Sequence, residues 1–253
     1  MTTGEAVRLR AVDGDLIGTT AFFRNRAYLG ALGREIAALG VAGRPVEILV
    51  HACSIGAEVW SLAIHLANTH PDVDYRILAT DLSPGFVAFA RNGVYPAEAL
   101  AQLSPEERRF VDDRGPQQQV IGADLRARVA FAAPADRVFD VVTLCNALVY
   151  VPADGQAQAI RRIAGYNQGL LAVTGGHKDT IARDLDSAGY EAVMDDFRAV
   201  HAGWTDRFRT RAPGVELPPN IFADPFMDPI DDRPGWRYRH GAIFRKRAVA
   251  AAA

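Results

Sequence analysis

The sequence predicts an α/β protein built on a doubly wound, mostly parallel sheet. Apolar runs rich in Val, Ile and Leu alternate with segments in which apolar residues recur every three or four positions, as on one face of a helix. This alternation is typical of parallel strands joined by helical crossovers. With 253 residues, of which 49% are hydrophobic and 23% charged, the chain is long enough for one α/β core and a small appendage.

The first strand–turn–helix unit begins after a helical segment at residues 28–39, which the break "GVAGRP" separates from "VEILV" at 46–50. This run is apolar on both faces, which favours a central parallel strand. Helical spacing returns over residues 58–69. The turn between strand and helix, "HACSIGAE", holds a single glycine, Gly56.

A second unit carries clear helix signals. The strand "YRILAT" leads to Asp81, and Ser83 with Pro84 forms an N-cap and first-turn pair. Gly93 is placed to end the helix that they begin. Further along, Ser104 and Glu107 are spaced as a capping box for a short helix.

The remaining chain predicts further strands and helices. The stretch "QQQVIGADLRARVAFAA" predicts short strands around a turn. "FDVVTLC" predicts a buried strand that ends at Asn146, and a helix at 154–167 leads to the strand "GLLAVT". After a helix at 178–189, residues 202–237 are expected to be irregular, and "YRHGAIFRKR" to form a closing edge strand.

The composition argues against several classes of partner and cofactor. The formal net charge of −2 and pI of about 6.3 make nucleic acid an unexpected partner. The chain has no run long enough to span a membrane and no apolar signal-peptide core, so no membrane partner is expected. Cys53 and Cys145 lie in apolar runs, which indicates a reducing, cytoplasmic setting. The histidines show no metal-ligand spacing, so no metal is expected.

A ligand site is expected at the edge where the carboxyl ends of parallel strands meet. Residues 51–54, Asp81 and Asn146 follow predicted strands and fall at this edge. A carboxylate such as Asp81 can accept both hydroxyls of a ribose; the ordinary alternative is that it caps a turn or helix. The turn at Gly56 lacks the G-x-G-x-x-G pattern, which argues against a nicotinamide oxidoreductase.

Four segments, in order, resemble one enzyme family. They are "TTAFFRNRAYLGAL", "HACSIGAEVWSLA", "ATDLSPGFVAFARNGVYP" and "FDVVTLCNALVYV", and they are similar to the chemotaxis receptor methyltransferases (CheR type). The resemblance covers about residues 17–177. It implies a class I methyltransferase fold, which is Rossmann-like, with a small β-subdomain at about residues 115–135. It also implies S-adenosylmethionine as cofactor and methylation of glutamate side chains.

The resemblance also implies roles for individual residues. Arg24 would lie near the sulfonium and is the candidate catalytic residue that positions the acceptor; a surface ion pair is its ordinary alternative. Phe22 and Phe23 beside it are expected to pack rather than react. Cofactor contacts are implied for Thr20, Arg24, Ala52, Cys53, Ser54, Gly56, Glu58, Asp81, Leu82, Asn146 and Ala147.

The chemistry agrees with this set of residues. A carboxylate attacks the sulfonium-bound methyl in line and needs no base at neutral pH, so aim and desolvation dominate. An arginine offers a fixed fork for a carboxylate. We therefore expect no Ser-His-Asp set and no metal cluster.

Three departures from the family shape the prediction. Gly18 stands where the family has Asn, and Ala57 stands where it has the first of two acids, so that only Glu58 remains and the methionyl ammonium must find another partner. Fewer than twenty residues precede the first matching segment, where the family has a receptor-binding helical domain. We therefore expect an acceptor other than a chemoreceptor.

The predicted function is S-adenosylmethionine-dependent methylation of a carboxylate on a small acidic or amino-acid-like metabolite. One alternative is a protein-glutamate O-methyltransferase that acts on a signalling partner; another is an inactive module that binds the cofactor. His177, Tyr150 and Arg207 are candidate acceptor contacts, with structural or solvated roles as alternatives.

The predicted domain organisation has three parts. Residues 1–27 cover the cofactor, residues 28–200 form the methyltransferase domain, and residues 201–253 form a lid or interface extension. Because that extension is aromatic and irregular, it is also the expected route to a homo-oligomer.

Overall fold

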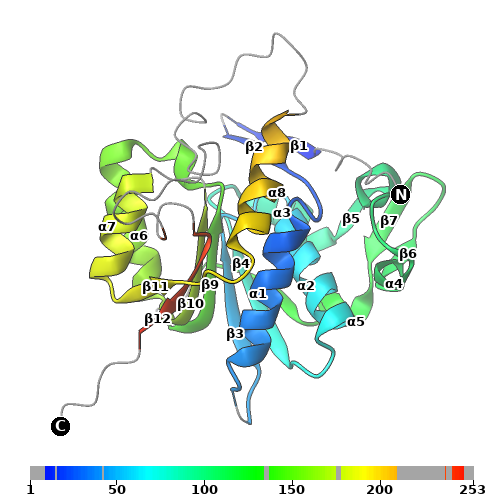
Figure 1. Ribbon diagram of the computed structural model, residues 1–253. Helices are drawn as coiled ribbons and strands as arrows, with labels where there is room; N and C mark the ends of the chain where they lie inside the picture. The colour runs from blue at the N-terminus through cyan, green and yellow to red at the C-terminus, as the bar shows by residue number, and fades with distance from the viewer. Residues whose placement is uncertain are drawn as a thin grey trace. The chain divides into compact units, whose positions relative to one another are not determined.

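The computed structural model of the chain describes residues 9–14, 16–41, 43–133, 137–174, 178–209, 237 and 241–247. The chain divides into two compact units, Met1–Ala135 and Asp136–Ala253 (Figure 1). The predicted division into residues 1–27, 28–200 and 201–253 stays a prediction.

The core of the first unit is a parallel sheet of β3 (Val46–His51), β4 (Tyr75–Thr80) and β8 (Val129–Phe131). The central residues of β3, Ile48 to Val50, are fully buried, as expected of a strand covered on both faces. Helices α1 (Arg26–Ala38) and α2 (Ala57–Thr69) lie side by side next to this sheet (Figure 1).

The capping signals read from the sequence are confirmed. Ser83 caps α3 (Pro84–Asn92) by accepting a hydrogen bond from the Phe86 amide, and Gly93 ends the helix at a φ of 64°. Ser104 and Glu107 form a complete capping box at the start of α4 (Pro105–Arg108). Each of these signals is local, so no tertiary contact is needed to explain it.

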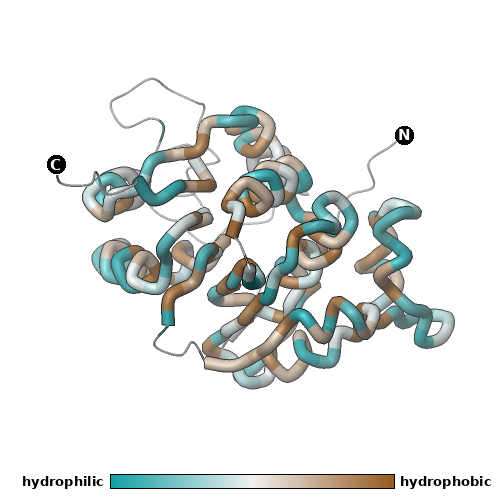
Figure 2. The backbone as a smooth tube through the Cα atoms, turned by 90° about the horizontal axis from the view of Figure 1, so that it is seen from below, coloured by the Kyte–Doolittle hydropathy of each residue, from teal (hydrophilic) through white to brown (hydrophobic). Residues whose placement is uncertain are grey.

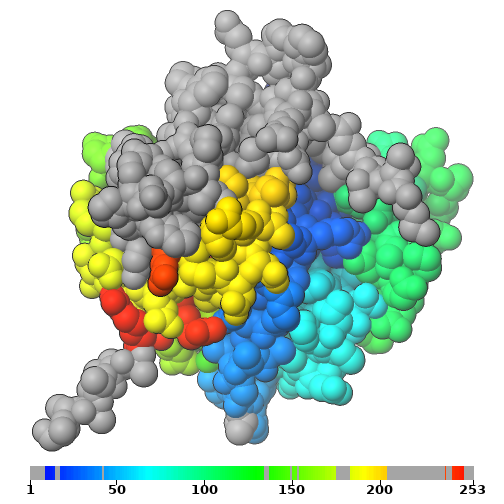
Figure 3. Space-filling model, viewed as in Figure 1, coloured from blue at the N-terminus to red at the C-terminus, as the bar shows by residue number. Residues whose placement is uncertain are grey.

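An N-terminal hairpin, which the sequence analysis did not predict, precedes α1. Its strands are β1 (Leu9–Asp13) and β2 (Leu16–Thr20), paired antiparallel. Gly14 in the connecting turn has a φ of 57°, a conformation that glycine adopts without strain. In Figure 3 the hairpin (dark blue) and α1 (lighter blue) form one continuous stretch of the surface of this unit.

The small β-subdomain lies earlier in the chain than the predicted 115–135. Its three antiparallel strands are β5 (Val94–Pro96), β6 (Val111–Asp113) and β7 (Gln118–Ile121), in the order β5-β7-β6. Short helices η1 (Ala97–Leu100) and α5 (Ala123–Arg126) adjoin these strands. The expected boundary was wrong because β8 pairs with β4 in the main sheet instead.

The second unit contains two parallel strands, β9 (Phe139–Cys145) and β10 (Asn167–Thr174), joined through η2 (Leu148–Tyr150) and α6 (Ala153–Gly165). All seven residues of β9 are buried. Helix α7 (Lys178–Ser187) precedes β11 (Tyr190–Ala192) and α8 (Phe197–Arg209).

Two predictions for this unit need correction. The expected edge strand is β12 (Ile243–Lys246), but it pairs antiparallel with both β10 and β11 and so lies between them. Residues 202–209, expected to be irregular, continue α8. Local pattern is a weak guide here, because most of the stability of helices in proteins comes from tertiary packing.

The predicted class, a doubly wound α/β protein with a mostly parallel sheet, is confirmed, because helices alternate with parallel strands in both units. In Figure 2 the helical coils mix hydrophilic and hydrophobic colours along their turns, as expected of helices that cover a core with one face. Across the described ranges, every helix is too short or too polar to cross a membrane.

Candidate cofactor site

The turn after β3 is held in a sparsely populated backbone conformation. Ala52 and Ser54 have φ values of 59° and 50°, and Gly56 has a φ of 87°. Phe23, next to Arg24, and Asn146, after β9, share this conformation, with φ values of 44° and 56°. Positive φ costs energy for residues other than glycine and tends to persist where function requires it. Four of these five residues are at positions predicted to contact the cofactor, and the fifth, Phe23, is next to one.

Asp81 connects this turn to the end of β4 through hydrogen bonds. Its Oδ2 accepts a hydrogen bond from the Ser54 amide at 2.7 Å, and its Oδ1 accepts one from the Ser83 amide at 3.0 Å. The capping role weighed against ribose binding is therefore present. Each carboxylate oxygen has a second lone pair, so capping leaves acceptor capacity for two hydroxyls. The next residue, Leu82, is 92% exposed.

The hydroxyl of Ser54 lies inside this turn without a partner. Its Oγ is buried and makes no hydrogen bond in the described structure. A buried polar atom left unsatisfied is uncommon in folded proteins and calls for a ligand or solvent partner. The turn therefore fits a polar ligand group, which is the chemistry expected of a methionyl or ribosyl moiety.

Gly56 is required both by its backbone conformation and by its neighbours. It precedes α2, and a Cβ there would lie 2.8 Å from both the Ala90 Cβ and the Tyr95 hydroxyl oxygen. The Tyr95 hydroxyl donates to the Ile55 carbonyl at 2.6 Å. Gly56 thus allows a close approach between the turn and neighbouring protein atoms.

The missing acid at residue 57 also has a structural explanation. Ala57 is completely buried, whereas Glu58 is partly exposed in the first turn of α2. A carboxylate at residue 57 would need a buried partner. Of these two positions, only residue 58 carries an acid, and that acid lies outside the core.

The segment from Thr20 to Arg24 is fixed by packing around its two phenylalanines. The Phe22 ring packs edge-to-face on Tyr95 at 4.8 Å, and the Phe23 amide donates to Ser61 Oγ at 2.8 Å. Both phenylalanine side chains are buried, so their predicted packing role is confirmed, while Thr20 and Arg24 remain partly exposed. The rigid backbone therefore presents these two polar side chains.

Arg26 is a structural cation, distinct from Arg24. Its guanidinium contacts Glu107 at 2.7 Å, donates to the Gln102 carbonyl at 2.9 Å, and stacks over the Phe23 ring at 4.3 Å. These contacts join the start of α1 to α4. Arg24 is the arginine to which the family resemblance assigns a role at the reaction centre.

Cys53 is a buried thiol rather than a nucleophile. Burial, reinforced by the negative charges of Asp81 and Glu58, raises the pKa of Cys53 to about 12. Because the thiolate is the reactive form, this side chain stays neutral and packs. Cys145 is likewise buried and not joined in a disulfide.

In the second unit, Asn146 follows β9 and its amide donates to both the Thr174 hydroxyl at 3.0 Å and the Thr174 carbonyl at 3.1 Å. Ala147 comes directly before η2, and Tyr150 at its end is 63% exposed. His177 lies outside the described residues. Arg207 falls within α8, but its side chain lies outside what the structure describes.

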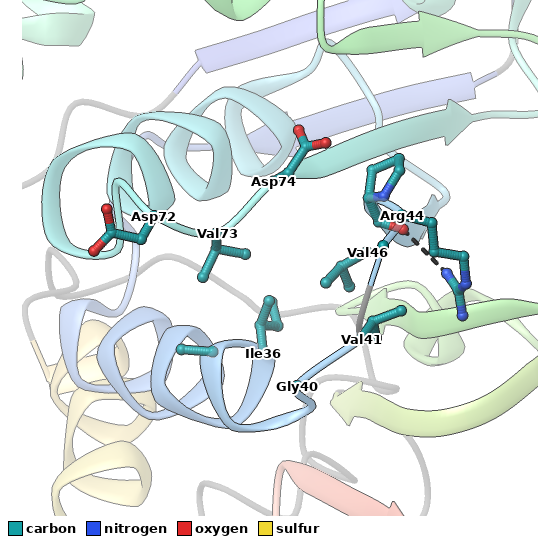
Figure 4. Close-up of a pocket in the computed structure, with 11 residues that line it drawn as sticks. Ile36, Gly40, Val41, Arg44, Val46, Asp72, Val73 and Asp74 are labelled. Carbon is teal, nitrogen blue, oxygen red and sulfur yellow. Dashed lines mark hydrogen bonds between the residues drawn. The ribbon is translucent and has the colours of Figure 1, made fainter.

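A cavity of the first unit lies at the opposite edge of its sheet. It has a volume of about 440 Å³ and is formed where α1 ends and where β3 and β4 begin (Figure 4). Ile36, Val46 and Val73 line it, and Arg44 donates to the neighbouring Pro45 carbonyl at 3.0 Å. It is therefore separate from the turn at Ser54. Over the same described ranges, the acidic, cysteine and histidine side chains form no cluster of three that suits a metal ion.

Two residues that meet beside the candidate site, Asp13 and Gly85, were not predicted from the sequence. Asp13 in the N-terminal hairpin accepts from the Ser83 hydroxyl and from the Gly85 amide at 3.0 Å. The available signal was the Asp13–Gly14 pair between two alternating segments, which is typical of a hairpin turn. Its partner 72 residues away had no such signal.

Known proteins resemble this chain in sequence. The chemotaxis protein methyltransferase of Listeria innocua is 29% identical over 176 residues, covering 65% of this chain and 66% of the relative. Chemotaxis protein methyltransferase 1 of Pseudomonas aeruginosa is 28% identical over 177 residues, covering 63% and 65%. The chain thus spans slightly less than two thirds of these relatives.

A solved structure shows a more distant likeness. Magnesium protoporphyrin IX methyltransferase from Synechocystis PCC 6803, with bound S-adenosylmethionine, is 16% identical with a TM-score of 0.42, covering 66% of this chain and 69% of that chain. This likeness is too distant to bear on the substrate.

One family model matches a segment that contains the turn at Ala52–Gly56, the Asp81 carboxylate and the Ser54 hydroxyl. That model is described as CheR methyltransferase, SAM binding domain, and it covers residues 18–190. The enzyme class and the cofactor predicted from the sequence, a methyltransferase and S-adenosylmethionine, are those of this family. The chain belongs to the CheR methyltransferase family.

Proposed function

We propose that this chain is an S-adenosylmethionine-dependent methyltransferase that methylates a carboxylate side chain of a protein. The observation that carries the proposal is the strained turn at Ala52–Gly56, tied through the Ser54 amide to the Asp81 carboxylate. The family membership and the printed names of the relatives, chemotaxis protein methyltransferases, support the reaction and the class of acceptor.

Different residues of the first unit would bind different parts of the cofactor. Asp81 would bind the ribose hydroxyls, since both of its oxygens retain acceptor capacity. The Ser54 hydroxyl would bind a polar group of the methionyl part, and Glu58 its ammonium. Thr20, Ala52, Cys53 and Leu82 would complete the walls. Asn146 and Ala147 also remain proposed cofactor contacts.

The bound cofactor supplies a methyl group on a sulfonium, and the chain supplies position. Arg24 would hold the acceptor carboxylate by paired hydrogen bonds, aimed at the methyl carbon. The acceptor carboxylate oxygen would take the methyl group as the carbon–sulfur bond breaks, S-adenosylhomocysteine would be the leaving group, and no proton transfer would be needed. The rate then depends on the geometry and on the exclusion of water around Arg24.

Protein acceptors fit the comparisons better than the small metabolite first expected from the sequence. Both relatives are named as chemotaxis protein methyltransferases, and neither printed name points to a metabolite. Tyr150, His177 and Arg207 remain proposed acceptor contacts. A cytoplasmic setting and a homo-oligomer formed through residues 201–253 also remain predictions.

The test has two stages. Calorimetry with S-adenosylmethionine and S-adenosylhomocysteine should show binding of both, and absence of either interaction would sink the proposal. The chain is then incubated with methyl-labelled cofactor and a glutamate-rich test protein. Label should enter the protein and be released by mild alkali as methanol, since methyl esters hydrolyse there. Binding without transfer would favour the inactive module, and label on free glutamate alone would favour the metabolite.

A further inference from the structure

The N-terminal hairpin lies beyond the carboxyl ends of β3 and β4, next to α3 (Figure 1). At one end of the hairpin, the Asp13 carboxylate sits on the first turn of α3. It accepts hydrogen bonds from the Ser83 hydroxyl and from the Gly85 amide at 3.0 Å. These two bonds hold the pKa of Asp13 below its ordinary value, so the contact is made by a charged group.

Gly85 makes this approach possible. A Cβ at residue 85 would lie 2.7 Å from Asp13 Oδ2 and 2.8 Å from its carboxyl carbon. Gly85 does not have a left-handed backbone conformation, so another residue would fit the helix itself. Glycine is a poor helix former; its presence here is explained by the carboxylate that occupies the space of a side chain.

The second strand of the hairpin makes a matching close approach. A Cβ at Gly18 would lie 2.5 Å from Ser54 Oγ and 3.0 Å from the Phe86 ring. The hairpin therefore touches both the turn after β3 and the helix after β4. Two glycines, one in the hairpin and one in the helix, permit the two contacts.

The two contacts close a ring around Asp81. Asp13 accepts from the Ser83 hydroxyl, and the Ser83 amide donates to one Asp81 oxygen. The other Asp81 oxygen accepts from the Ser54 amide, and the Ser54 hydroxyl faces Gly18 in the hairpin. The hairpin and the carboxylate proposed to bind the ribose are thus fixed by the same contacts.

We propose that Asp13 is a positioning residue that latches the hairpin onto α3, orients Asp81 through Ser83, and slows release of the cofactor. Its link to the cofactor rests on the proposed function, whereas the latch itself does not. The latch acts by geometry, because Asp13 reaches Asp81 only through the Ser83 side chain and backbone.

Four variants test the latch: Asp13→Ala, Asp13→Asn, Gly85→Ala and the double variant Asp13→Ala with Gly85→Ala. Val12→Thr is the matched control, since Val12 is exposed on the same strand. Hydrogen exchange at amides of residues 9–20 is measured without cofactor. Dissociation of S-adenosylhomocysteine is then followed by stopped flow.

Asp13→Ala and Gly85→Ala should each speed hairpin exchange and cofactor dissociation by about tenfold, the size expected from one charge-assisted hydrogen bond. The double variant should be no faster than Asp13→Ala, because the added methyl then meets no carboxylate. Asp13→Asn, which keeps an acceptor oxygen, should recover part of the loss. Association rates and Val12→Thr should change little.

Unchanged exchange in Asp13→Ala would overturn the latch, and so would additive effects in the double variant. Faster exchange with an unchanged dissociation rate would overturn the positioning role. If the unaltered chain binds no S-adenosylhomocysteine, the proposed function fails instead, and the exchange measurement alone decides the latch.

Discussion

A Cβ atom on residue 18 would lie 2.5 Å from the Ser54 hydroxyl oxygen. Gly18 replaces an asparagine expected from the family resemblance, and this contact explains why a larger residue does not fit. The space that a side chain would need is held by Ser54 and by the Phe86 ring, 3.0 Å away. The departure is therefore a packing requirement of the hairpin against the cofactor turn.

Substitution of Gly18 by alanine should destabilise the protein. The methyl group must displace Ser54 Oγ or the Phe86 ring, and such overpacking costs about 1–3 kcal/mol. Urea denaturation measures the free energy of unfolding. Ser54→Gly should largely relieve the cost in the same chain, so equal losses in the two backgrounds would show that the clash lies elsewhere.

Replacement of Asp81 by asparagine should weaken cofactor binding by at least tenfold. The amide nitrogen would face either the Ser54 or the Ser83 amide, donor against donor, and the charge toward the ribose would be lost, for about 1.5–3 kcal/mol. Calorimetry with S-adenosylhomocysteine gives the affinity. Asp124→Asn, at an exposed carboxylate in the first turn of α5, is the control. Affinity equal to that of the unaltered chain would exclude Asp81 from the site.

Arg24→Lys and Arg24→Ala should lower turnover more than they lower cofactor affinity. Lysine keeps the charge but not the planar fork, so aim toward the methyl group is lost. The measurement is the rate of methyl transfer beside the affinity for S-adenosylhomocysteine. Arg76→Lys, at an exposed position on β4, should alter neither. Full turnover in Arg24→Ala would remove this residue from the mechanism.

Stability should fall as the pH drops from about 6.5 toward 4 because of His65. Burial, reinforced by the nearby His70 ring, lowers the pKa of His65 to about 4 from 6.5. Between these values the unfolded chain binds more protons than the folded chain, so the stability present above pH 6.5 is lost on acidification. Arg26 and Arg34 act in the same direction, and Glu107 opposes them.

Urea denaturation at several pH values measures this dependence. His65→Gln should flatten the decline between pH 6.5 and 4, because the titrating ring is removed. Parallel curves for the two proteins would show that other groups, such as the carboxylates with lowered pKa values, account for the acid sensitivity.

Much of the first unit was predictable because its signals are local. The apolar run at 46–50 predicts a buried strand. The two ends of α3 are marked by Ser83, Pro84 and Gly93, which lie within ten residues of one another. The sequence likewise placed Asp81 after a strand, where both its oxygens now hold backbone amides. The predictions failed where pairing was long-range: β8 joins β4, and β12 lies between β10 and β11.

The sequence by itself determined the α/β class, the family, and the turn that is a candidate for the cofactor, since periodicity, caps and motif order are written along the chain. Only the tertiary structure decided what surrounds that turn. The contacts of Asp13 with Gly85 and of Gly18 with Ser54 join residues distant in sequence. A glycine in the sequence does not indicate which neighbouring residue occupies the space beside it. Such close approaches are set by how the hairpin docks, which no local pattern encodes.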